Sequence, residues 1–210
     1  MKKILALALT AAFAAPAFAA DNVLVFSTDG TYPPFSETGS DGKMTGFDID
    51  IGLALCAQMK RECRYEQMDW EGLIPALKTH KIDAIVASMN DTPERRESIS
   101  FTDPYYTNPG IFVRAKGSSI EPTPAGVKGK TVGVQRATIF DNYVTDNFPD
   151  ANIQRYTSIE EANLDAIAGR LDLIFADKFV MQDGFLQRDE GKDFEQAGAD
   201  VDDKKYFGAG

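Results

Sequence analysis

The chain has few of the residues that metal sites and nucleic-acid surfaces need. Among its 210 residues there are two cysteines, Cys56 and Cys63, and a single histidine, His80. A metal centre needs more soft ligands than these three side chains supply, so we expect no metal site. The formal net charge is −10, whereas phosphate binding requires a basic face. We therefore expect no nucleic-acid partner.

Long apolar runs are also missing after the first residues, where nothing approaches the roughly 18 apolar residues of a membrane span. The start is organised as a secretory signal: Lys2 and Lys3, the apolar residues 4–14, and Ala17-Phe18-Ala19. Pro16 interrupts this run, which is too short for a membrane anchor, and no cysteine at the cleavage site offers a lipid anchor. We predict a signal peptide over residues 1–19 and a soluble, exported mature protein.

A glycine-rich phosphate loop is absent too, so we expect no nucleotide and no other cofactor. The mature chain instead repeats one strand-helix-strand-helix-strand pattern. The first copy predicts strands at 23–28, 64–68 and 82–87 and helices at 47–60 and 70–78, with a kink or restart at Pro75. The second predicts strands at 131–134, 153–156 and 173–176 and helices at 140–148 and 159–169. This order indicates an α/β fold with a parallel sheet covered by helices.

The first predicted helix, 47–60, has an apolar face and an acidic start. Apolar residues recur on it every four positions: Phe47, Ile51, Leu55 and Met59. Asp48 and Asp50 lie in its first turn, where the helix dipole favours acidic side chains. Cys56 lies within it and Cys63 soon after, and two close cysteines in an exported protein usually pair.

A capped turn follows the strand at 82–87. Thr92 is a good N-cap, and Pro93 suits the first helical position. Arg95 then takes the third position, where a capping box has Glu or Gln and where a cation opposes the helix dipole. A guanidinium fixed there can hold a carboxylate with two parallel hydrogen bonds. The alternative is an ordinary surface ion pair.

Polar side chains gather where the predicted strands end. Ligands of parallel sheets bind beyond the carboxyl ends of the strands. In this chain those ends carry Asp29 and Tyr32, residues 88–95, residues 135–139 and Asp177. Two similar lobes that face each other would build one cleft from all four segments.

Five motifs resemble the polar amino-acid periplasmic binding proteins of ABC importers, notably the lysine/arginine/ornithine and histidine binding proteins: Thr31-Tyr32-Pro33-Pro34-Phe35, Gly46-Phe47-Asp48-Ile49-Asp50, Leu73-Ile74-Pro75-Ala76-Leu77, Thr92-Pro93-Glu94-Arg95 and Phe101-Thr102-Asp103-Pro104-Tyr105-Tyr106. The resemblance covers residues 21–210. It implies a two-lobed periplasmic binding protein fold of type II, in which each lobe has a mostly parallel sheet and the lobes close on one amino acid. It also implies a monomer in the periplasm that delivers its ligand to an inner-membrane ABC permease and is not an enzyme.

The resemblance implies a ligand site as well. Arg95 stands where the family binds the ligand carboxylate, and Asp177 where it binds the α-ammonium. Asp29 stands where binders of basic amino acids have an acid for the side chain, which is stacked between aromatic residues. The aromatic positions and the remaining expected ligand residues are Tyr32, Trp70, Ser88, Asn90, Thr138 and Ile139. From the residues alone, Asp29 can equally cap a turn, and the aromatic pair can belong to the core.

Three positions depart from the lysine/arginine/ornithine binders. Ala87 and Asn90 replace serines, and Ile139 brings no hydroxyl where those proteins have one, although the backbone N–H groups there can still bind a carboxylate. These changes leave open whether the basic ligand is arginine, ornithine, lysine or histidine. Cys56 and Cys63 match a disulfide found in this group.

The resemblance also divides the chain. It implies lobe 1 over residues 20–107, lobe 2 over residues 108–201 and the start of a return crossing over residues 202–210. In the family, several tens of further residues complete lobe 1 after this crossing. We therefore expect the C-terminal part of lobe 1 to be missing, which would leave apolar faces and a sheet edge uncovered. A fragment of this kind would bind weakly and aggregate.

Two other functions stay open. The periplasmic cyclohexadienyl dehydratases look similar, and such an enzyme needs a general acid or base with a perturbed pKa in the cleft. Asp29 and Asp177 are candidates, but each has a simpler role opposite a ligand cation. The second is an extracytoplasmic sensor domain, against which the cleavage signal and the lack of a later membrane segment count.

Overall fold

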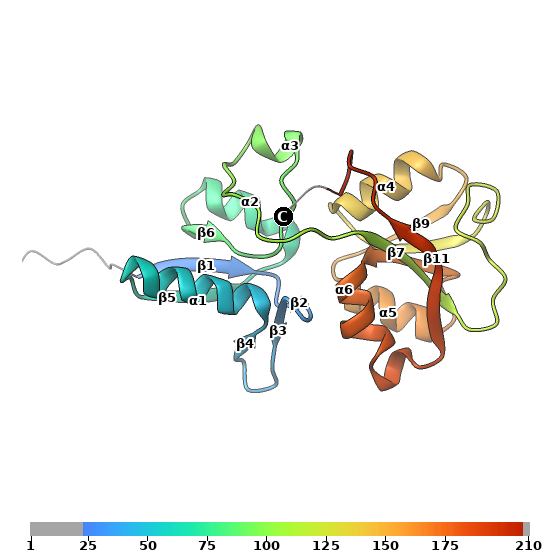
Figure 1. Ribbon diagram of the computed structural model, residues 1–210, viewed down its shortest axis with the longest axis horizontal. Helices are drawn as coiled ribbons and strands as arrows, with labels where there is room; N and C mark the ends of the chain where they lie inside the picture. Colours follow the sequence, from blue (N-terminus) through green and yellow to red (C-terminus); the bar gives the residue numbers. More distant parts are fainter. Residues whose placement is uncertain (1–22, 208–210) are drawn as a thin grey trace, which may run out of the picture.

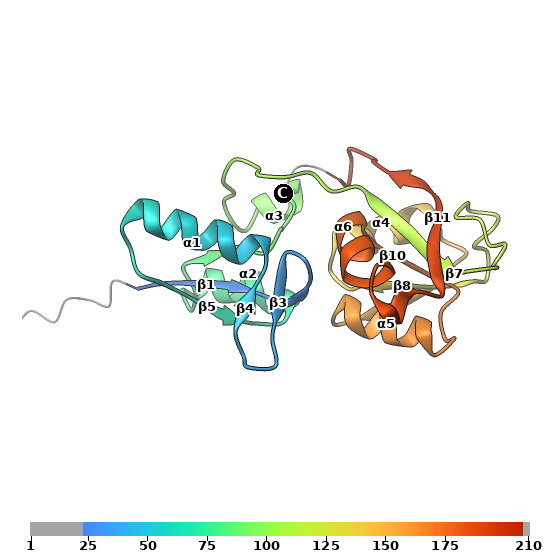
Figure 2. The same cartoon turned by 60° about the horizontal axis from the view of Figure 1, so that its bottom comes forward.

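The structure, a computed structural model, describes residues 23–207, which form two lobes that lie side by side (Figure 1). The predicted signal peptide, residues 1–19, lies outside the described residues, as does the end of the predicted return crossing, residues 208–210. Each lobe has a β-sheet with helices packed against it (Figure 2). The two-lobed α/β fold that the sequence predicts is therefore confirmed.

The main sheet of lobe 1 has three parallel strands in the order β5-β1-β6, which are β1 (Leu24–Thr28), β5 (Cys63–Gln67) and β6 (Ala84–Ile85). The predicted helices are α1 (Phe47–Met59) and α2 (Trp70–Lys78). The helix α2 continues through Pro75, so of the predicted kink or restart the restart does not occur. Proline removes one main-chain hydrogen bond, and burial of Leu73 and Ala76 keeps the helix on the sheet.

The buried face of α1 differs from the predicted one. Phe47, Leu55 and Met59 are exposed, and the helix packs instead through Ile49, Gly52 and Cys56. A Cβ atom added at Gly52 would lie 1.8 Å from the hydroxyl of Tyr65, so only glycine lets β5 come this close. The predicted disulfide between Cys56 and Cys63 is confirmed, with 6.1 Å between the Cα atoms. Small residues therefore decide which face of α1 is buried.

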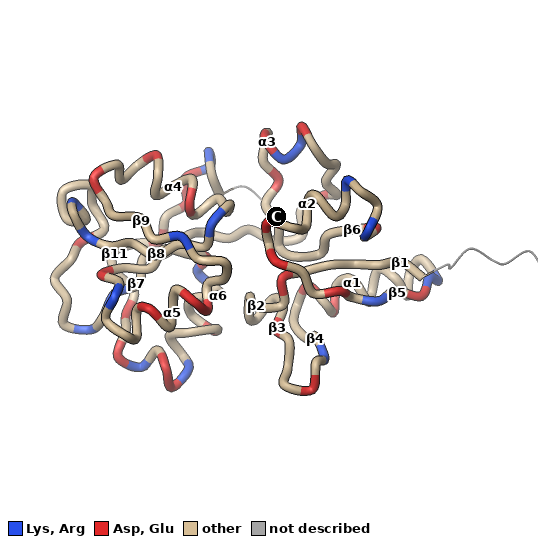
Figure 3. The backbone as a smooth tube through the Cα atoms, turned by 180° about the vertical axis from the view of Figure 1, so that it is seen from behind, with Lys and Arg blue, Asp and Glu red and all other residues tan. Residues whose placement is uncertain are grey.

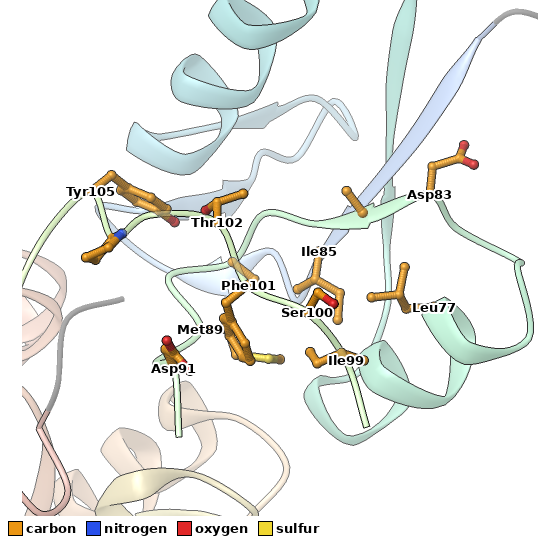
Figure 4. A pocket seen from close by; sticks show the side chains of 13 residues that line it. Leu77, Asp83, Ile85, Met89, Asp91, Ile99, Ser100, Phe101, Thr102 and Tyr105 are labelled. Atoms are coloured by element: carbon orange, nitrogen blue, oxygen red, sulfur yellow. The ribbon is translucent and has the colours of Figure 1, made fainter. Parts of the chain in front are cut away.

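The strand β6 is shorter than the predicted strand at 82–87, because only Ala84 and Ile85 pair with β1, and the extended conformation ends before Ser88. Ser88 has a φ of 49°, which is left-handed and incompatible with a strand. Beside β6, apolar side chains line a pocket that is drawn in Figure 4, among them Leu77, Ile85, Met89, Ile99 and Phe101. All of its lining residues belong to lobe 1.

Residues 29–46, predicted as a turn, contain three short antiparallel strands: β2 (Thr31–Tyr32), β3 (Ser36–Thr38) and β4 (Met44–Thr45). This small sheet projects from lobe 1 next to lobe 2 (Figure 2). The side chain of Ser36 ties it to the main sheet, because its hydroxyl accepts a hydrogen bond from Thr28 at 2.9 Å. The segment after β1 is therefore held firmly at the edge of the cleft.

Lobe 2 has a five-stranded sheet in the order β11-β7-β10-β8-β9. The predicted strands are β8 (Thr131–Gln135), β9 (Asn152–Tyr156) and β10 (Leu173–Asp177), which are parallel. Two further strands, β7 (Gly110–Ala115) and β11 (Phe194–Val201), are not predicted, and both pairings of β7 are antiparallel. The sheet of lobe 2 is therefore mixed, and the rings of Phe112 and Phe175 pack 4.2 Å apart in its core.

The helices of lobe 2 are α4 (Ile139–Asn147), α5 (Ile159–Ile167) and α6 (Lys178–Met181), and a π-helical turn, Gln182–Leu186, follows them. The described end of the chain packs on this lobe, since the ring of Phe207 lies 5.6 Å from that of Phe140. No helix between residues 23 and 207 combines the length and apolar character that crossing a membrane requires. Basic and acidic residues are interspersed over both lobes (Figure 3).

Candidate functional site

Side chains from both lobes meet in one pocket between them. Lobe 1 contributes the segment after β1, the start of α2 and the residues around α3 (Pro93–Arg96), and lobe 2 contributes Asn108, Gln135, Thr138, Ile139 and Phe140. Eight of the nine ligand residues that the sequence predicts line this pocket: Asp29, Tyr32, Trp70, Ser88, Asn90, Arg95, Thr138 and Ile139. The ninth, Asp177, is fully buried at the end of β10. It reaches the pocket through Asn108, a lining residue that hydrogen-bonds to it.

Arg95 is held in the pocket by neutral groups. The predicted cap is present, because the hydroxyl of Thr92 accepts a hydrogen bond from the Arg95 backbone N–H at 3.3 Å. The guanidinium donates to the backbone carbonyls of Asn90 at 2.8 Å and of Ala137 at 3.4 Å. Burial lowers the pKa of Arg95 to about 10. No acidic side chain between residues 23 and 207 forms an ion pair with it, so the surface ion pair considered above is not found.

Asp29 is a buried carboxylate that faces lobe 2. It accepts hydrogen bonds from the hydroxyl of Ser36 and from the side-chain amide of Gln135, each at 3.3 Å. The turn contact expected of a cap is also present, but the backbone N–H of Thr31 lies 3.5 Å away. Burial raises the pKa of Asp29 above its usual value. Asp29 therefore has the contact of a turn cap and also a contact across the cleft.

Asp177 combines a structural role with a place directly behind the lining of the site. Its carboxylate caps α6 by accepting the backbone N–H groups of Phe179 at 2.7 Å and Val180 at 3.1 Å. The hydroxyl of Tyr106 donates to its other oxygen at 3.3 Å. Burial raises the pKa of Asp177. In the described part of the chain no lysine or arginine pairs with Asp29 or Asp177, so this end of the pocket is acidic.

The two predicted aromatic residues line the pocket and make further contacts. The ring of Tyr32 lies 6.2 Å from that of Phe35. The indole N–H of Trp70 donates to the backbone carbonyl of Ala137 at 3.0 Å, and the Arg95 guanidinium lies over its ring at 5.3 Å. Trp70 therefore links the two lobes and supports Arg95, roles that its sequence context does not indicate.

The remaining predicted residues act mainly through neighbouring groups. Asn90 donates to the side chain of Asn108 at 2.8 Å. Thr138 caps α4 by accepting the backbone N–H of Asp141 at 3.2 Å, and its own hydroxyl donates to the Gln135 carbonyl at 2.7 Å. The side chain of Ile139 is buried in the core of lobe 2. At the start of α4, backbone N–H groups are therefore the donors that face an anion.

Several polar residues at the site are missed by the sequence analysis: Asp48, Tyr105, Tyr106, Asn108 and Gln135. Asp48 lies in a motif of the family resemblance, but the helix dipole already explained an acid there. Gln135 lies in the predicted segment 135–139 without a role of its own. The two tyrosines also lie in a quoted motif, whose residues the resemblance does not assign to ligand binding.

The lobes touch on both sides of the pocket. Glu37 of β3 accepts two hydrogen bonds from the guanidinium of Arg188, at 3.2 and 3.3 Å. On another side, Arg136 forms an ion pair with Glu71 of α2. Together with the contact from Trp70 to Ala137, these interactions describe lobes that are closed on each other.

The fold and the pocket define a class, the two-lobed solute-binding proteins. The bacterial extracellular solute-binding proteins, family 3, match this chain over residues 24–198, and the chain belongs to this family. The family that the motifs suggested is thereby confirmed.

The chain is similar to several characterised members. It is 45% identical to the L-arginine-binding protein of Pseudomonas aeruginosa over 197 residues, 93% of this chain and 76% of that protein. It is 39% identical to the lysine/arginine/ornithine-binding periplasmic protein of Escherichia coli K12, over all of this chain and 82% of that one. Among solved structures, a Salmonella typhimurium periplasmic binding protein of high arginine specificity superposes with a TM-score of 0.83 and 33% identity, over 90% of this chain and 82% of that one.

Proposed function

We propose that this protein is the solute-binding component of an amino-acid ABC importer and that its ligand is a basic amino acid, with arginine the first candidate. The observation that carries the proposal is the separation of unpaired charge in the pocket. Within the described residues, Arg95 at one end forms no ion pair with an acid, and Asp29 and Asp177 form none with a lysine or arginine. A basic amino acid brings one carboxylate and two cations, which is the complement of these three side chains.

Each group of such a ligand has a candidate partner. Arg95 and the backbone N–H groups at Thr138 and Ile139 hold the α-carboxylate, and Asp177 holds the α-ammonium. Asp29 receives the cationic end of the side chain between Tyr32 and Trp70, with Ser88 and Asn90 completing the site. Buried ionic contacts of this kind exclude ligands that leave one member unpaired. The names of the relatives, which are binders of arginine, lysine and ornithine, support a ligand of this class.

The biological setting is part of the same proposal. Residues 1–19 direct export and are removed, and the mature protein works in the periplasm as a monomer with no cofactor. Lobe 1 comprises residues 20–107, lobe 2 comprises residues 108–201, and residues 202–210 begin a return crossing. The closed lobes present their ligand to an inner-membrane ABC permease.

An enzyme on this fold has weaker support. Acid–base catalysis needs a titrating group that reaches the substrate. Asp29 and Asp177 have raised pKa values, but each stands opposite a ligand cation in the proposed site, and Asp48, whose pKa is raised to about 6, is fully buried. The relatives named above are binding proteins, which favours a binder over a cyclohexadienyl dehydratase-like enzyme.

Isothermal titration calorimetry of the purified protein with the common amino acids and with prephenate tests the proposal. We expect tight binding of arginine, with ornithine, lysine and histidine weaker and glutamate and leucine inert. We also expect no turnover of prephenate or arogenate. A preference for glutamate or leucine, or steady release of a product, would contradict this function.

A further inference from the structure

Behind the ligand pocket, the buried carboxylate of Asp48 accepts hydrogen bonds from Ser88, which lines the pocket, and from Tyr105. Asp48, in the first turn of α1, is fully buried. The Ser88 hydroxyl lies 2.9 Å from each of its two carboxylate oxygens, and the Tyr105 hydroxyl donates to Oδ1 at 2.8 Å. No lysine or arginine forms an ion pair with Asp48 in the described residues. A charge in this position is stabilised only by these donors.

The same network fixes the backbone of Ser88. Its N–H donates to the Tyr105 hydroxyl at 3.1 Å, so that hydroxyl accepts from Ser88 and donates to Asp48. Ser88 is one of the few non-glycine residues with a positive φ, 49°, and such a conformation persists only where its surroundings enforce it. Tyr105, which also lines the lobe 1 pocket of Figure 4, is therefore part of what holds Ser88 in place.

The direction of the Ser88 hydrogen bond follows from proton counting. A serine hydroxyl has one proton to donate and lone pairs that accept. An ionised carboxylate can only accept, so the proton of Ser88 must point at Asp48. Ser88 also lines the pocket between the lobes. Only its lone pairs are then available to a ligand, and they suit an ammonium group rather than a carboxylate.

We propose that Asp48 is a positioning residue that polarises Ser88, so that the Ser88 hydroxyl accepts a hydrogen bond from the α-ammonium of the ligand. The inference rests on the proposed function, because it assumes an amino acid in this pocket. Tyr106 supports the location, since its hydroxyl donates to Asp177 at 3.3 Å and it also lies against Ser88. Ser88 and Asp177, the proposed ammonium partner, are thus close to one another.

The decisive variant is Asp48→Asn, which keeps the shape of the side chain. Tyr105 continues to donate to the remaining oxygen, and the new amide nitrogen donates to the Ser88 hydroxyl, which turns the Ser88 proton towards the pocket. Affinities are measured by calorimetry for arginine and for 5-guanidinopentanoate, which is arginine without its α-amino group. We expect the preference of the wild type for arginine over this analogue to fall at least tenfold in the variant.

Two control variants separate polarisation from general damage. Tyr65→Phe removes a hydrogen bond to the backbone carbonyl of Asp48 but leaves Ser88 and Tyr105 donating to its carboxylate, so the preference for arginine should change less than twofold. Asp50→Asn removes an exposed charge from the same helical turn and should also leave the preference unchanged. An equal loss of both ligands in Asp48→Asn, or an unchanged preference, would overturn the inference.

A pH series gives a second readout. Burial and the nearby charges of Asp29 and Asp177 raise the pKa of Asp48 to about 6, against the hydrogen bonds from Tyr105 and Ser88. Tyr65 and Tyr106 also face this region but ionise far above neutrality. The preference for arginine should therefore fall between pH 8 and pH 5 more steeply in the wild type than in Asp48→Asn, because Asp29 and Asp177 titrate in both. Parallel pH profiles would contradict the proposal.

If Asp48→Asn melts below the assay temperature, Ser88→Ala decides the question. Loss confined to arginine supports the inference, and an equal loss of arginine and the analogue overturns it. A wild-type protein that binds no amino acid at all would instead refute the proposed function. The two failures are therefore distinguishable.

Discussion

The two ends of the pocket differ from each other in charge, and both differ from the surface around them. At one end Arg95 is held by carbonyl groups and by the ring of Trp70, and it forms no ion pair within the described residues. At the other end Asp29 and Asp177 are buried among neutral donors. Charged groups are costly to bury without a partner. A ligand with the opposite arrangement of charges would therefore supply the partners that these buried groups lack.

Arg95 and Arg96, which are neighbours in one helical turn, differ in the same way as the pocket and the surface. Arg96 forms an ion pair with Asp91 and is exposed, as surface arginines generally are. Arg95, one residue earlier, points between the lobes and has only neutral partners. The difference comes from the cap at Thr92, which fixes which of the two side chains faces lobe 2.

The largest expected effect is at the basic end. Arg95→Ala should weaken arginine binding by more than about 3 kcal/mol, because a desolvated charge pair loses one partner. Arg95→Lys should also bind poorly, since an ammonium cannot make the forked contact. Calorimetry measures both, with Arg96→Ala as the matched control that should bind normally. Near-native affinity in both Arg95 variants would refute its role.

A selective loss is expected at the acidic end. Asp29→Asn should lower the affinity for arginine by about 2 kcal/mol or more, because a buried cation loses its counter-charge. Glutamine, which has no side-chain cation, should be affected far less. Competition of both ligands against a labelled amino acid measures the ratio. An equal loss of affinity for the two ligands would show that Asp29 does not bind the side-chain cation and acts only through its turn contact with Thr31.

Acid should move ligand-free stability and ligand affinity in opposite directions. The folded pKa values of Asp29 and Asp177 are raised, and that of Asp48 is about 6. Folding therefore takes up protons, and the stability from these groups is present at low pH and lost as pH rises through the raised values. For Asp48 alone the change is on the order of 3 kcal/mol.

The measurement is a melting series of the ligand-free protein from pH 5 to pH 8, beside calorimetry with arginine. The melting temperature should rise towards pH 5, whereas arginine affinity should fall because the ligand needs ionised carboxylates. Acids whose pKa values are lowered, such as Asp146 and Asp200, titrate below this window. Melting and binding that change in parallel would contradict the acidic end as described.

The smallest effect is expected at the rim. Glu37→Gln removes the charge that Arg188 meets across the cleft and should weaken ligand binding by less than about 1 kcal/mol, since exposed pairs contribute little. High ionic strength should erase the difference. Glu66→Gln, which breaks the pair with Arg64 inside lobe 1, is the control and should not alter affinity. A loss as large as that of Arg95→Ala would show that the rim pair contributes as much to ligand binding as Arg95 does.

The sequence predicted correctly those elements that depend on residues close together in the chain. The helix α2 begins and ends as predicted, and Thr92 caps α3 through its own side chain. The strands β7 and β11 were missed, because their pairing depends on each other and on β10, far away in the chain. The buried face of α1 was misjudged, because it depends on the contact of Gly52 with Tyr65.

The candidate site shows the same difference between features that depend on nearby residues and features that depend on distant ones. The family motifs pointed to residues that do line one pocket, but not to what each side chain contacts there. Asp48 is the clearest case: its partners Ser88 and Tyr105 are 40 and 57 residues away, so nothing in its helical context reveals its burial. Trp70 likewise gains its link to Ala137 only when the lobes close.

The most direct test of the two unpaired ends is a cycle between ligand deletions and side-chain deletions. Agmatine lacks the carboxylate of arginine, and citrulline has a neutral group in place of its guanidinium. In the wild type, calorimetry should give at least about 100-fold weaker binding for each analogue than for arginine. Arg95→Ala should make arginine and agmatine nearly equal, and Asp29→Asn should do the same for arginine and citrulline. If each variant instead keeps the full preference of the wild type, the two ends do not recognise the ligand as described.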